Sequence, residues 1–244
     1  YEIVVRLVGS EMCIRESNMR YFTSNFFDLG GQTLYVSRTG FTNELGFEIF
    51  CDGFKTDHLA LWDYLIECGK PYGMQFSASR AMTIRRIEGG IFGNLTDIDT
   101  TITPFEAGLG YFVNMDKDFI GKDALIKKDK RTCLFGITCK TAVPKAGSKI
   151  KINDKQVGYI TAGVPSPTLQ QGIGYVRFYE PNDYMNKEIE IILPDNSSHT
   201  GVVVDLPFYD KEKKIVKGID RSIPIKPDSL SLIHISEPTR RTTI

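Results

Sequence analysis

Two short runs near the start of the chain have the composition and alternation of β-strands. Residues 33–38 and 46–51 are rich in β-branched and aromatic side chains, which suit a pleated, half-buried surface. The intervening residues 39–45 contain a glycine and an asparagine, which favour a tight turn. This pattern predicts two strands joined by a short connection.

Three stretches are predicted to be helical, and the first carries apolar residues at helical spacing. The first follows Thr56 or Asp57 as N-cap and continues until Gly69, which predicts an amphipathic helix. A second helix is predicted over 77–87, before a pair of glycines, and a short third one over 121–128.

A further helix start is predicted at residue 103. Thr103 suits the N-cap, Pro104 suits the first helical position, and Glu106 stands where a capping box places its glutamate. These three residues together predict a capped helix.

After about residue 130 the chain changes to short strands separated by Gly, Pro, Asn and Asp, which predicts a β-barrel or sandwich. We expect the domain boundary near 129–131, where a lysine-rich stretch would form a solvated linker. The predicted strands cover 133–139, 149–152, 157–162, 173–178, 188–193 and 201–206.

The composition is that of a globular protein without a surplus of charge. Of the 244 residues, 41% are hydrophobic and 25% charged, and 30 Lys and Arg balance 30 Asp and Glu. Nucleic acids and acidic membranes are bound through an excess of basic residues on one face. No apolar run approaches the roughly 18 residues of a membrane span. We therefore expect small molecules or proteins as partners, and neither nucleic acid nor membrane.

The cysteines argue for a reducing compartment. There are five of them, an odd number, and none forms a C-x-x-C pair. This spacing indicates neither a disulfide framework nor a zinc site. We expect a cytoplasmic protein without a structural metal.

Both ends of the chain differ in character from its middle. The motifs at 8–15 and 232–242 resemble translations of a common sequencing-library adapter. We therefore expect 1–16 and 232–244 to be adapter-derived and the fold to lie within 17–231. The natural protein is then truncated at its start.

No group of residues indicates catalysis by itself. His58 and His199 lack the sequence partners of a hydrolytic triad or a zinc motif, so a structural role is expected for each. Asp97 and Asp99 either form a carboxylate pair or cap a turn, and a turn cap is the expectation. The basic stretch 211–217 predicts a solvated loop.

Several motifs in order resemble the glycine-cleavage T-protein (aminomethyltransferase) family. The likeness begins at Ser37-Arg-Thr-Gly-Phe-Thr-Asn-Glu-Leu-Gly-Phe-Glu-Ile49 and covers nearly all of 17–231. The other motifs are Arg86-Ile-Glu-Gly-Gly90, Asp97-Ile-Asp99, Thr103-Pro-Phe-Glu-Ala-Gly-Leu109, Asp118-Phe-Ile-Gly-Lys-Asp-Ala-Leu125, Gly158-Tyr-Ile-Thr-Ala-Gly-Val-Pro-Ser-Pro167 and Gly172-Ile-Gly-Tyr175.

The resemblance implies an α+β fold: a partial folate-binding domain over 17–129, followed by an antiparallel C-terminal β-barrel over 130–231. It implies a tetrahydrofolate-dependent aminomethyltransferase or methyltransferase as the full-length parent. The one-carbon donor is then a methylated amine or a sulfonium compound, with a lipoyl carrier protein as a further candidate partner. Family members carry an N-terminal half with a catalytic aspartate ahead of this segment. We therefore assign no catalytic residue and expect no catalysis by this chain alone.

The resemblance also implies that Glu48 holds the pterin ring of tetrahydrofolate. The pterin edge presents a ring N–H and an exocyclic amine side by side, and one carboxylate can accept from both. Strand alternation gives a different expectation, in which Glu48 turns outward while Phe47 and Ile49 form the core.

Arg86 and Arg85 are the other candidate cofactor-binding residues. In the family, an arginine that contacts folate lies six residues before the glutamate matching Glu88, and Met82 stands there in this chain. Arg86 lies one turn further on and on nearly the same helix face. It is a candidate replacement, with Arg85 as its neighbour. The alternative for both is a structural ion pair.

Three other functions compete with aminomethyl transfer. The stretch around 86–90 leans toward the dimethylsulfoniopropionate demethylase branch of the family. A non-catalytic folate-binding module would carry Lys-Gly-Cys-Tyr-x-Gly-Gln-Glu, whereas Phe119-Ile-Gly-Lys122 stands in the comparable stretch. The folate-binding end of a dimethylglycine or sarcosine dehydrogenase would need a dinucleotide fold upstream.

Overall fold

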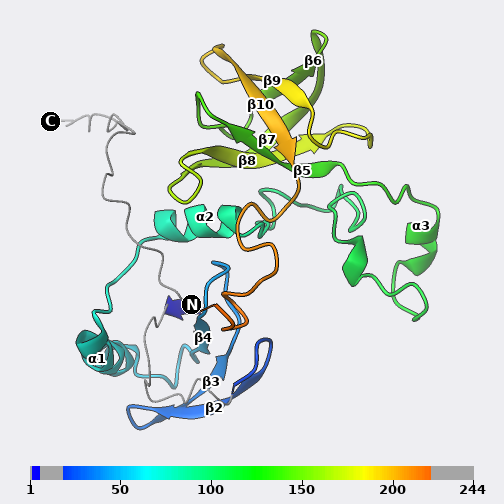
Figure 1. Ribbon diagram of the computed structural model, residues 1–244. Coiled ribbons are helices and arrows are strands. Elements are labelled where there is room, and N and C mark those ends of the chain that lie inside the picture. Colours follow the sequence, from blue (N-terminus) through cyan, green and yellow to red (C-terminus); the bar gives the residue numbers. More distant parts are fainter. Residues whose placement is uncertain (1, 6–18, 221–244) are drawn as a thin grey trace, which may run out of the picture.

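The computed structural model of the chain describes residues 2–5 and 19–220, which form an α+β domain and a closed β-barrel (Figure 1). Helix α2 (Ser79–Glu88) lies between the sheet of the first domain and the barrel. The α+β fold with a C-terminal barrel is therefore confirmed. Among the described residues, no helix is long and apolar enough to cross a membrane.

The first domain is built on a four-stranded antiparallel sheet with the order β1-β4-β3-β2. The predicted strands appear as β3 (Gln32–Ser37) and β4 (Phe47–Phe50). The sequence did not indicate β2 (Ser24–Leu29), because most of its side chains are exposed. Its hairpin with β3 turns at Gly30 and Gly31, whose φ angles of 65° and 81° suit glycine.

The fourth strand, β1 (Glu2–Val5), falls within the segment 1–16 that was expected to be adapter-derived. It pairs antiparallel with β4 from Glu2 opposite Phe50 to Val5 opposite Phe47. Residues 2–5 therefore extend the sheet, a role that the sequence did not indicate. The adapter-like motifs at 8–15 and 232–242 lie outside the described residues.

Helix α1 (His58–Gly69) packs on one face of this sheet and forms the first core with it. Asp57 caps the helix as predicted, since its carboxylate accepts from the amide of Ala60 at 3.0 Å. Leu61 and Leu65 are buried against apolar residues of β3 and β4. Burial of each such side chain stabilises the fold by about 1.5–3 kcal/mol.

The second domain is a closed six-stranded barrel, which confirms the barrel and excludes the sandwich. The strand order is β10-β5-β8-β7-β6-β9, and all pairs are antiparallel. Closure leaves no strand edge open to other chains. The strands are β5 (Leu134–Cys139), β6 (Lys149–Ile152), β7 (Lys155–Ser166), β8 (Gln171–Phe178), β9 (Glu188–Ile192) and β10 (Ser198–Val204).

Glycines allow the connection after β5 to cross the barrel wall closely. A Cβ atom at Gly163 would lie 1.6 Å from the carbonyl oxygen of Pro144, and one at Gly172 would lie 2.0 Å from that of Ala142. Only glycine leaves room for backbone at these distances, so these two positions of β7 and β8 require it.

The capping box at Thr103 forms, but the predicted helix does not follow it. The amide of Thr103 donates to the Glu106 carboxylate at 2.8 Å, and the amide of Glu106 donates to the Thr103 hydroxyl at 3.2 Å. Gly108 then takes a φ of 74°, which ends the segment after one turn. The helix prediction here is wrong because the stop signal lies so close to the start.

The remaining helical segments are short. Two 3-10 turns cover Lys70–Tyr72 (η2) and Gly110–Phe112 (η3), and α3 covers Lys122–Ile126. The segment carrying α3 extends away from both domains in Figure 1. It exposes several large apolar side chains, namely Tyr111, Phe112, Ile120 and Ile126.

Substitution of Leu61 tests the role of the first core. We expect Leu61→Ala to lower the free energy of unfolding by about 2–5 kcal/mol, because it leaves a cavity at a fully buried position. Leu59→Ala on the same helix is the control, since Leu59 is 79% exposed and should change stability by less than about 0.5 kcal/mol. Equal losses in urea unfolding would contradict this packing.

Candidate functional site

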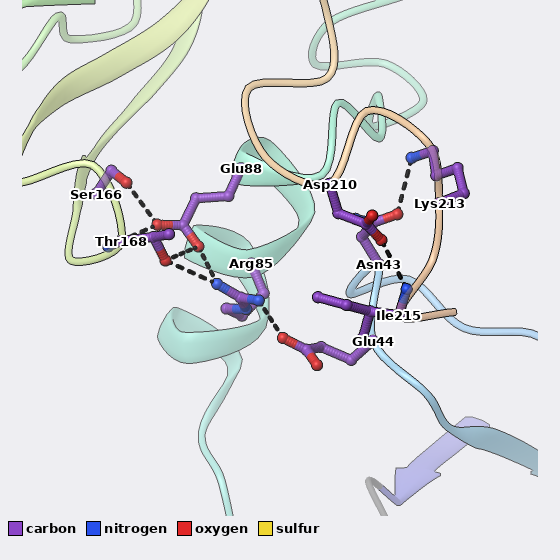
Figure 2. A network of polar contacts seen from close by, with 9 residues as sticks. All are labelled: Asn43, Glu44, Arg85, Glu88, Ser166, Thr168, Asp210, Lys213 and Ile215. Atoms are coloured by element: carbon purple, nitrogen blue, oxygen red, sulfur yellow. Dashed lines mark hydrogen bonds and ion pairs between the residues drawn. The ribbon is translucent and has the colours of Figure 1, made fainter. Parts of the chain in front are cut away.

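The last turn of α2 is the point where distant segments of the chain meet (Figure 2). The turn 39–45 between β3 and β4 reaches it from the first domain. The β7–β8 turn reaches it from the barrel. The segment 205–218, here termed the strap, returns to it after the last barrel strand.

Glu88 at the end of α2 is fully buried, yet its carboxylate is satisfied on both oxygens. One oxygen accepts from the Ser166 hydroxyl and from the amide of Thr168 at 3.2 Å. The other accepts from the Thr168 hydroxyl at 3.1 Å and from Arg85. A buried carboxylate is tolerated only with such partners. Glu88 thus fastens α2 to the barrel.

Arg85 bridges two buried carboxylates from different parts of the chain. Its guanidinium pairs with Glu88 and with Glu44 of the turn 39–45, and it donates to the Thr168 hydroxyl at 3.0 Å. It also lies 5.4 Å from the ring centre of Tyr209 in the strap. Arg85 therefore joins the first domain, α2 and the barrel.

Arg86 forms a second buried ion pair on another side of the helix. It donates to Asp97 at 2.8 Å and to the carbonyl of Ile91 at 3.0 Å. Asp97 also accepts from the amide of Gly93 at 2.7 Å and from the Thr161 hydroxyl of β7 at 2.9 Å. The amide contact confirms that Asp97 caps a turn. Asp99 also caps a turn, since it accepts from the amide of Thr101 at 2.8 Å. It pairs with Arg177 at 3.4 Å, so each aspartate has its own cation and the two do not form a carboxylate pair.

Tyr175 of β8 completes the junction at the end of α2. Its hydroxyl lies 3.1–3.3 Å from the carbonyl oxygens of Arg86, Ile87 and Ile91. The last carbonyl groups of a helix have no amide donor within the helix, and the Tyr175 hydroxyl is a hydrogen-bond donor for the carbonyls at the end of α2. Burial raises the pKa of Tyr175 well above its ordinary value, so the phenol remains a donor at neutral pH.

The stretch 211–217 of the strap is only partly the solvated loop that the sequence predicts, because Lys211, Lys214 and Lys217 are exposed whereas Lys213 is not. Lys213 donates to the side-chain oxygen of Asn43 at 2.8 Å (Figure 2). It also donates to the carbonyl of Gly89 at 2.9 Å. Burial lowers the pKa of Lys213. The next apolar pair, Ile215 and Val216, is buried. The burial of Ile215 and Val216 was not predicted, because the residues around them in the sequence are mostly charged.

Glu48 lies on the face of the sheet opposite the first core. Its neighbours Phe47 and Ile49 are each 1% exposed and belong to that core, which confirms the prediction from strand alternation. Glu48 itself is half-buried. Its carboxylate accepts a hydrogen bond from the Thr39 hydroxyl, and the Ser37 and Thr39 hydroxyls also contact each other.

Aromatic rings share this face with Glu48. Tyr35 of β3 stands opposite Phe50 of β4, and Phe26 of β2 lies on the far side of Tyr35. The ring centres are 5.2 Å and 5.7 Å apart, and all three rings are well exposed. Within the described residues no cation pairs with Glu48, so its carboxylate keeps acceptor capacity beside this aromatic surface.

The structure does not bring the three predicted cofactor residues into direct contact. Glu48 lies on β4, whereas Arg85 and Arg86 pair with Glu44, Glu88 and Asp97 at α2. The two groups are connected through the turn 39–45. Cofactor binding by the two arginines stays a prediction, and the structure places both in the ion pairs that were the alternative.

Ser37 and Thr39 are neighbours of Glu48 that were not predicted from the sequence. Ser37 stands directly opposite Glu48 in the β3–β4 register, and Thr39 follows two residues later. Both neighbours can be identified from the sequence by pairing the residues on the two sides of the turn 39–45 as an antiparallel hairpin.

A cavity of about 190 Å³ lies between the barrel and the segment after α2. Arg177 on its wall donates to the Thr101 hydroxyl at 2.7 Å. Burial raises the pKa of Cys133 to about 11, so this thiol is not a nucleophile near neutral pH. The lining residues are Thr101, Ile102, Glu106, Cys133, Tyr159, Arg177, Phe178 and Tyr179.

In the described part of the chain, no group of three or more His, Cys, Asp or Glu side chains is placed to hold a metal ion.

The described residues therefore define a two-domain architecture, in which an α+β domain is fastened through α2 to a closed antiparallel barrel. The model of the GCVT N-terminal domain matches residues 2–117, and that of the glycine cleavage T-protein C-terminal barrel domain matches residues 130–210. The chain belongs to the glycine-cleavage T-protein family.

Similar proteins carry a consistent name. An aminomethyltransferase of Alkaliphilus oremlandii is 39% identical over 220 residues, and one of Caldanaerobacter subterraneus subsp. tengcongensis is 37% identical over 222 residues. Each match covers 87% of this chain but only 57–58% of the relative. The chain thus spans little more than half the length of these relatives.

A solved structure supports the fold. The glycine cleavage system aminomethyltransferase T from Bartonella henselae superimposes with a TM-score of 0.66 at 22% identity. The match covers 79% of this chain and 53% of that protein.

The buried ion pair of Arg86 can be tested by removing its charge. Arg86→Met leaves Asp97 buried without its cation, so we expect a loss of about 3–5 kcal/mol in the free energy of unfolding. Lys70→Met is the control, because Lys70 and its partner Glu67 are both largely exposed. A loss for Arg86→Met as small as that of the control in urea unfolding would contradict the role of the pair.

The raised pKa of Cys133 predicts a specific reactivity. In the folded chain, alkylation of Cys133 should be undetectable near pH 8 and should still increase between pH 9 and 10, because its thiolate forms only near pH 11. Peptide mass spectrometry after iodoacetamide treatment measures this site by site. The chain unfolded in urea is the control, in which Cys133 should react like an ordinary thiol. Rapid labelling of the folded chain near pH 8 would refute the burial.

Proposed function

We propose that this chain is the folate-holding and barrel part of a tetrahydrofolate-dependent aminomethyltransferase. The family and the names of the similar proteins support this class of transferase. The observation that carries the proposal is Glu48, an acceptor without a cation partner among the described residues, on a half-buried position next to exposed aromatic rings.

The residues around Glu48 suit a reduced pterin. Each carboxylate oxygen has two acceptor positions, and among the described residues Thr39 occupies one of the four. Both oxygens therefore remain available for the ring N–H and the exocyclic amine of the pterin edge. Tyr35 and Phe50 on the same face offer flat apolar surface to a planar ligand.

In this proposal the chain orients rather than reacts. When bound, tetrahydrofolate supplies a ring nitrogen that takes up the one-carbon group. Glu48 fixes the orientation of the pterin, and orientation alone contributes on the order of 7–11 kcal/mol at best to lowering a barrier. No catalytic residue is assigned within the chain. Arg85 and Arg86 maintain the frame, and a direct contact of either with folate stays a prediction.

The proposed donor is an aminomethyl group on a lipoyl carrier protein. This follows the aminomethyltransferase name of the similar proteins and the family resemblance. A sulfonium donor, as in the dimethylsulfoniopropionate branch, stays a prediction. So does a reducing, cytoplasmic location.

The central residue of the proposal can be tested by titration calorimetry with 5-formyltetrahydrofolate as a stable reduced folate. Glu48→Gln should weaken binding by well over tenfold, about 1.5–3 kcal/mol, because a charged hydrogen-bond acceptor is lost. Glu67→Gln on the exposed side of α1 is the matched control and should bind like the wild type. Unchanged affinity of Glu48→Gln would refute the assignment.

A further inference from the structure

Three residues of the β3–β4 hairpin form a row of polar side chains on one face of the sheet. Ser37 lies directly opposite Glu48 in the antiparallel register, so their side chains point to the same side. Thr39 follows two residues after Ser37 and returns to that side. Ser37 is 7% exposed, and Thr39 and Glu48 are half-buried, so water has restricted access to this row.

The hydrogen bonds of this row have a defined direction. An ionised carboxylate only accepts, so the single proton of the Thr39 hydroxyl points to Glu48. The Thr39 oxygen must then accept in its contact with Ser37, whose hydroxyl donates. The order of donation is therefore Ser37 to Thr39 to Glu48.

Such a chain restricts the freedom of the glutamate. An unrestrained glutamate side chain samples many rotamers and loses this entropy when a ligand orders it. Threonine is branched at Cβ and stiff at its first torsion, so it is a rigid donor. The contact also occupies only one acceptor position of Glu48, which leaves the others to a ligand.

From this geometry we propose that Thr39 is a positioning residue for Glu48, with Ser37 holding Thr39 in turn, so that the carboxylate is ordered before a reduced pterin binds. The inference rests on the proposed function and deepens it. Thr39 touches Glu48 and acts through it.

The test compares two substitutions of Thr39 by calorimetric titration with 5-formyltetrahydrofolate. Thr39→Val keeps the shape but removes the hydroxyl, and we expect affinity to fall by roughly three- to tenfold, the range of a single hydrogen bond. Thr39→Ser keeps the hydroxyl and should stay within about twofold of the wild type. Ser37→Ala should cause a smaller loss than Thr39→Val.

A double-mutant cycle separates positioning from a general structural effect. If Thr39 acts through the charge of Glu48, Thr39→Val should weaken binding much less in a Glu48→Gln background than in the wild type, because the charge-assisted bond is already lost. The proposal would be overturned if Thr39→Val reduced the affinity by the same factor in the wild type and in the Glu48→Gln background. Thermal unfolding of each variant, expected to match the wild type within a few degrees, checks that the fold is intact.

The outcomes distinguish this inference from the proposed function. The proposed function itself is refuted if the wild type shows no measurable affinity for 5-formyltetrahydrofolate. It is also refuted if the wild type binds and Glu48→Gln binds with the same affinity. A weakened Glu48→Gln together with full affinity of Thr39→Val refutes the positioning role alone. If Thr39→Val strongly lowers the unfolding temperature, the affinities of Thr39→Ser and Ser37→Ala become the test. The inference is then overturned if Ser37→Ala binds with full affinity while Thr39→Ser loses more than threefold.

Discussion

The last turn of α2 holds two buried carboxylates through ion pairs. Arg85 pairs with Glu88 of the same turn, and Arg86 pairs with Asp97 of the following segment. Consecutive helical residues point about 100° apart, so Arg85 and Arg86 serve different sides of the junction. Arg85 connects Glu88 with the turn of the first domain, whereas Arg86 holds Asp97 against the barrel. A buried polar network of this kind rigidifies a structure only if every member is satisfied. Both carboxylates are satisfied here, since backbone amides and hydroxyls occupy acceptor positions that the arginines leave. The network is not complete, because Nε of Arg85 and the side-chain nitrogen of Asn43 are buried without a hydrogen-bond partner among the described residues.

This junction also determines where the candidate ligand residue lies. The turn 39–45 is held at Glu44 by Arg85 and at Asn43 by Lys213 of the strap. The same turn begins with Thr39 and leads directly into β4, which carries Glu48. The position of Glu48 relative to the barrel therefore depends on contacts made several residues away from it. The arginines that resemblance suggested as cofactor contacts have this framing role in the structure.

Features that depend on nearby residues were predictable from the sequence. Strand alternation predicted the outward side of Glu48, and the Asp57 cap and the end at Gly69 predicted α1. Regularly spaced short strands predicted a barrel or a sandwich, and the family resemblance implied the barrel that forms. Contacts between distant residues were not predictable, because the partners of Arg85 include Glu44, 41 positions earlier in the chain. The helix predicted after Thr103 is absent for a local reason, since Gly108 takes a positive φ and ends the segment one turn after the capping box.

The claim that Glu48 presents an ordered carboxylate to a pterin is tested most directly by a crystal structure of the protein with a reduced folate bound. The account predicts that both oxygens of Glu48 lie within about 3.2 Å of the ring N–H nitrogen and the exocyclic amine of the pterin, with the Thr39 contact retained. A well-ordered folate bound elsewhere on the chain, with Glu48 turned to solvent, would contradict it.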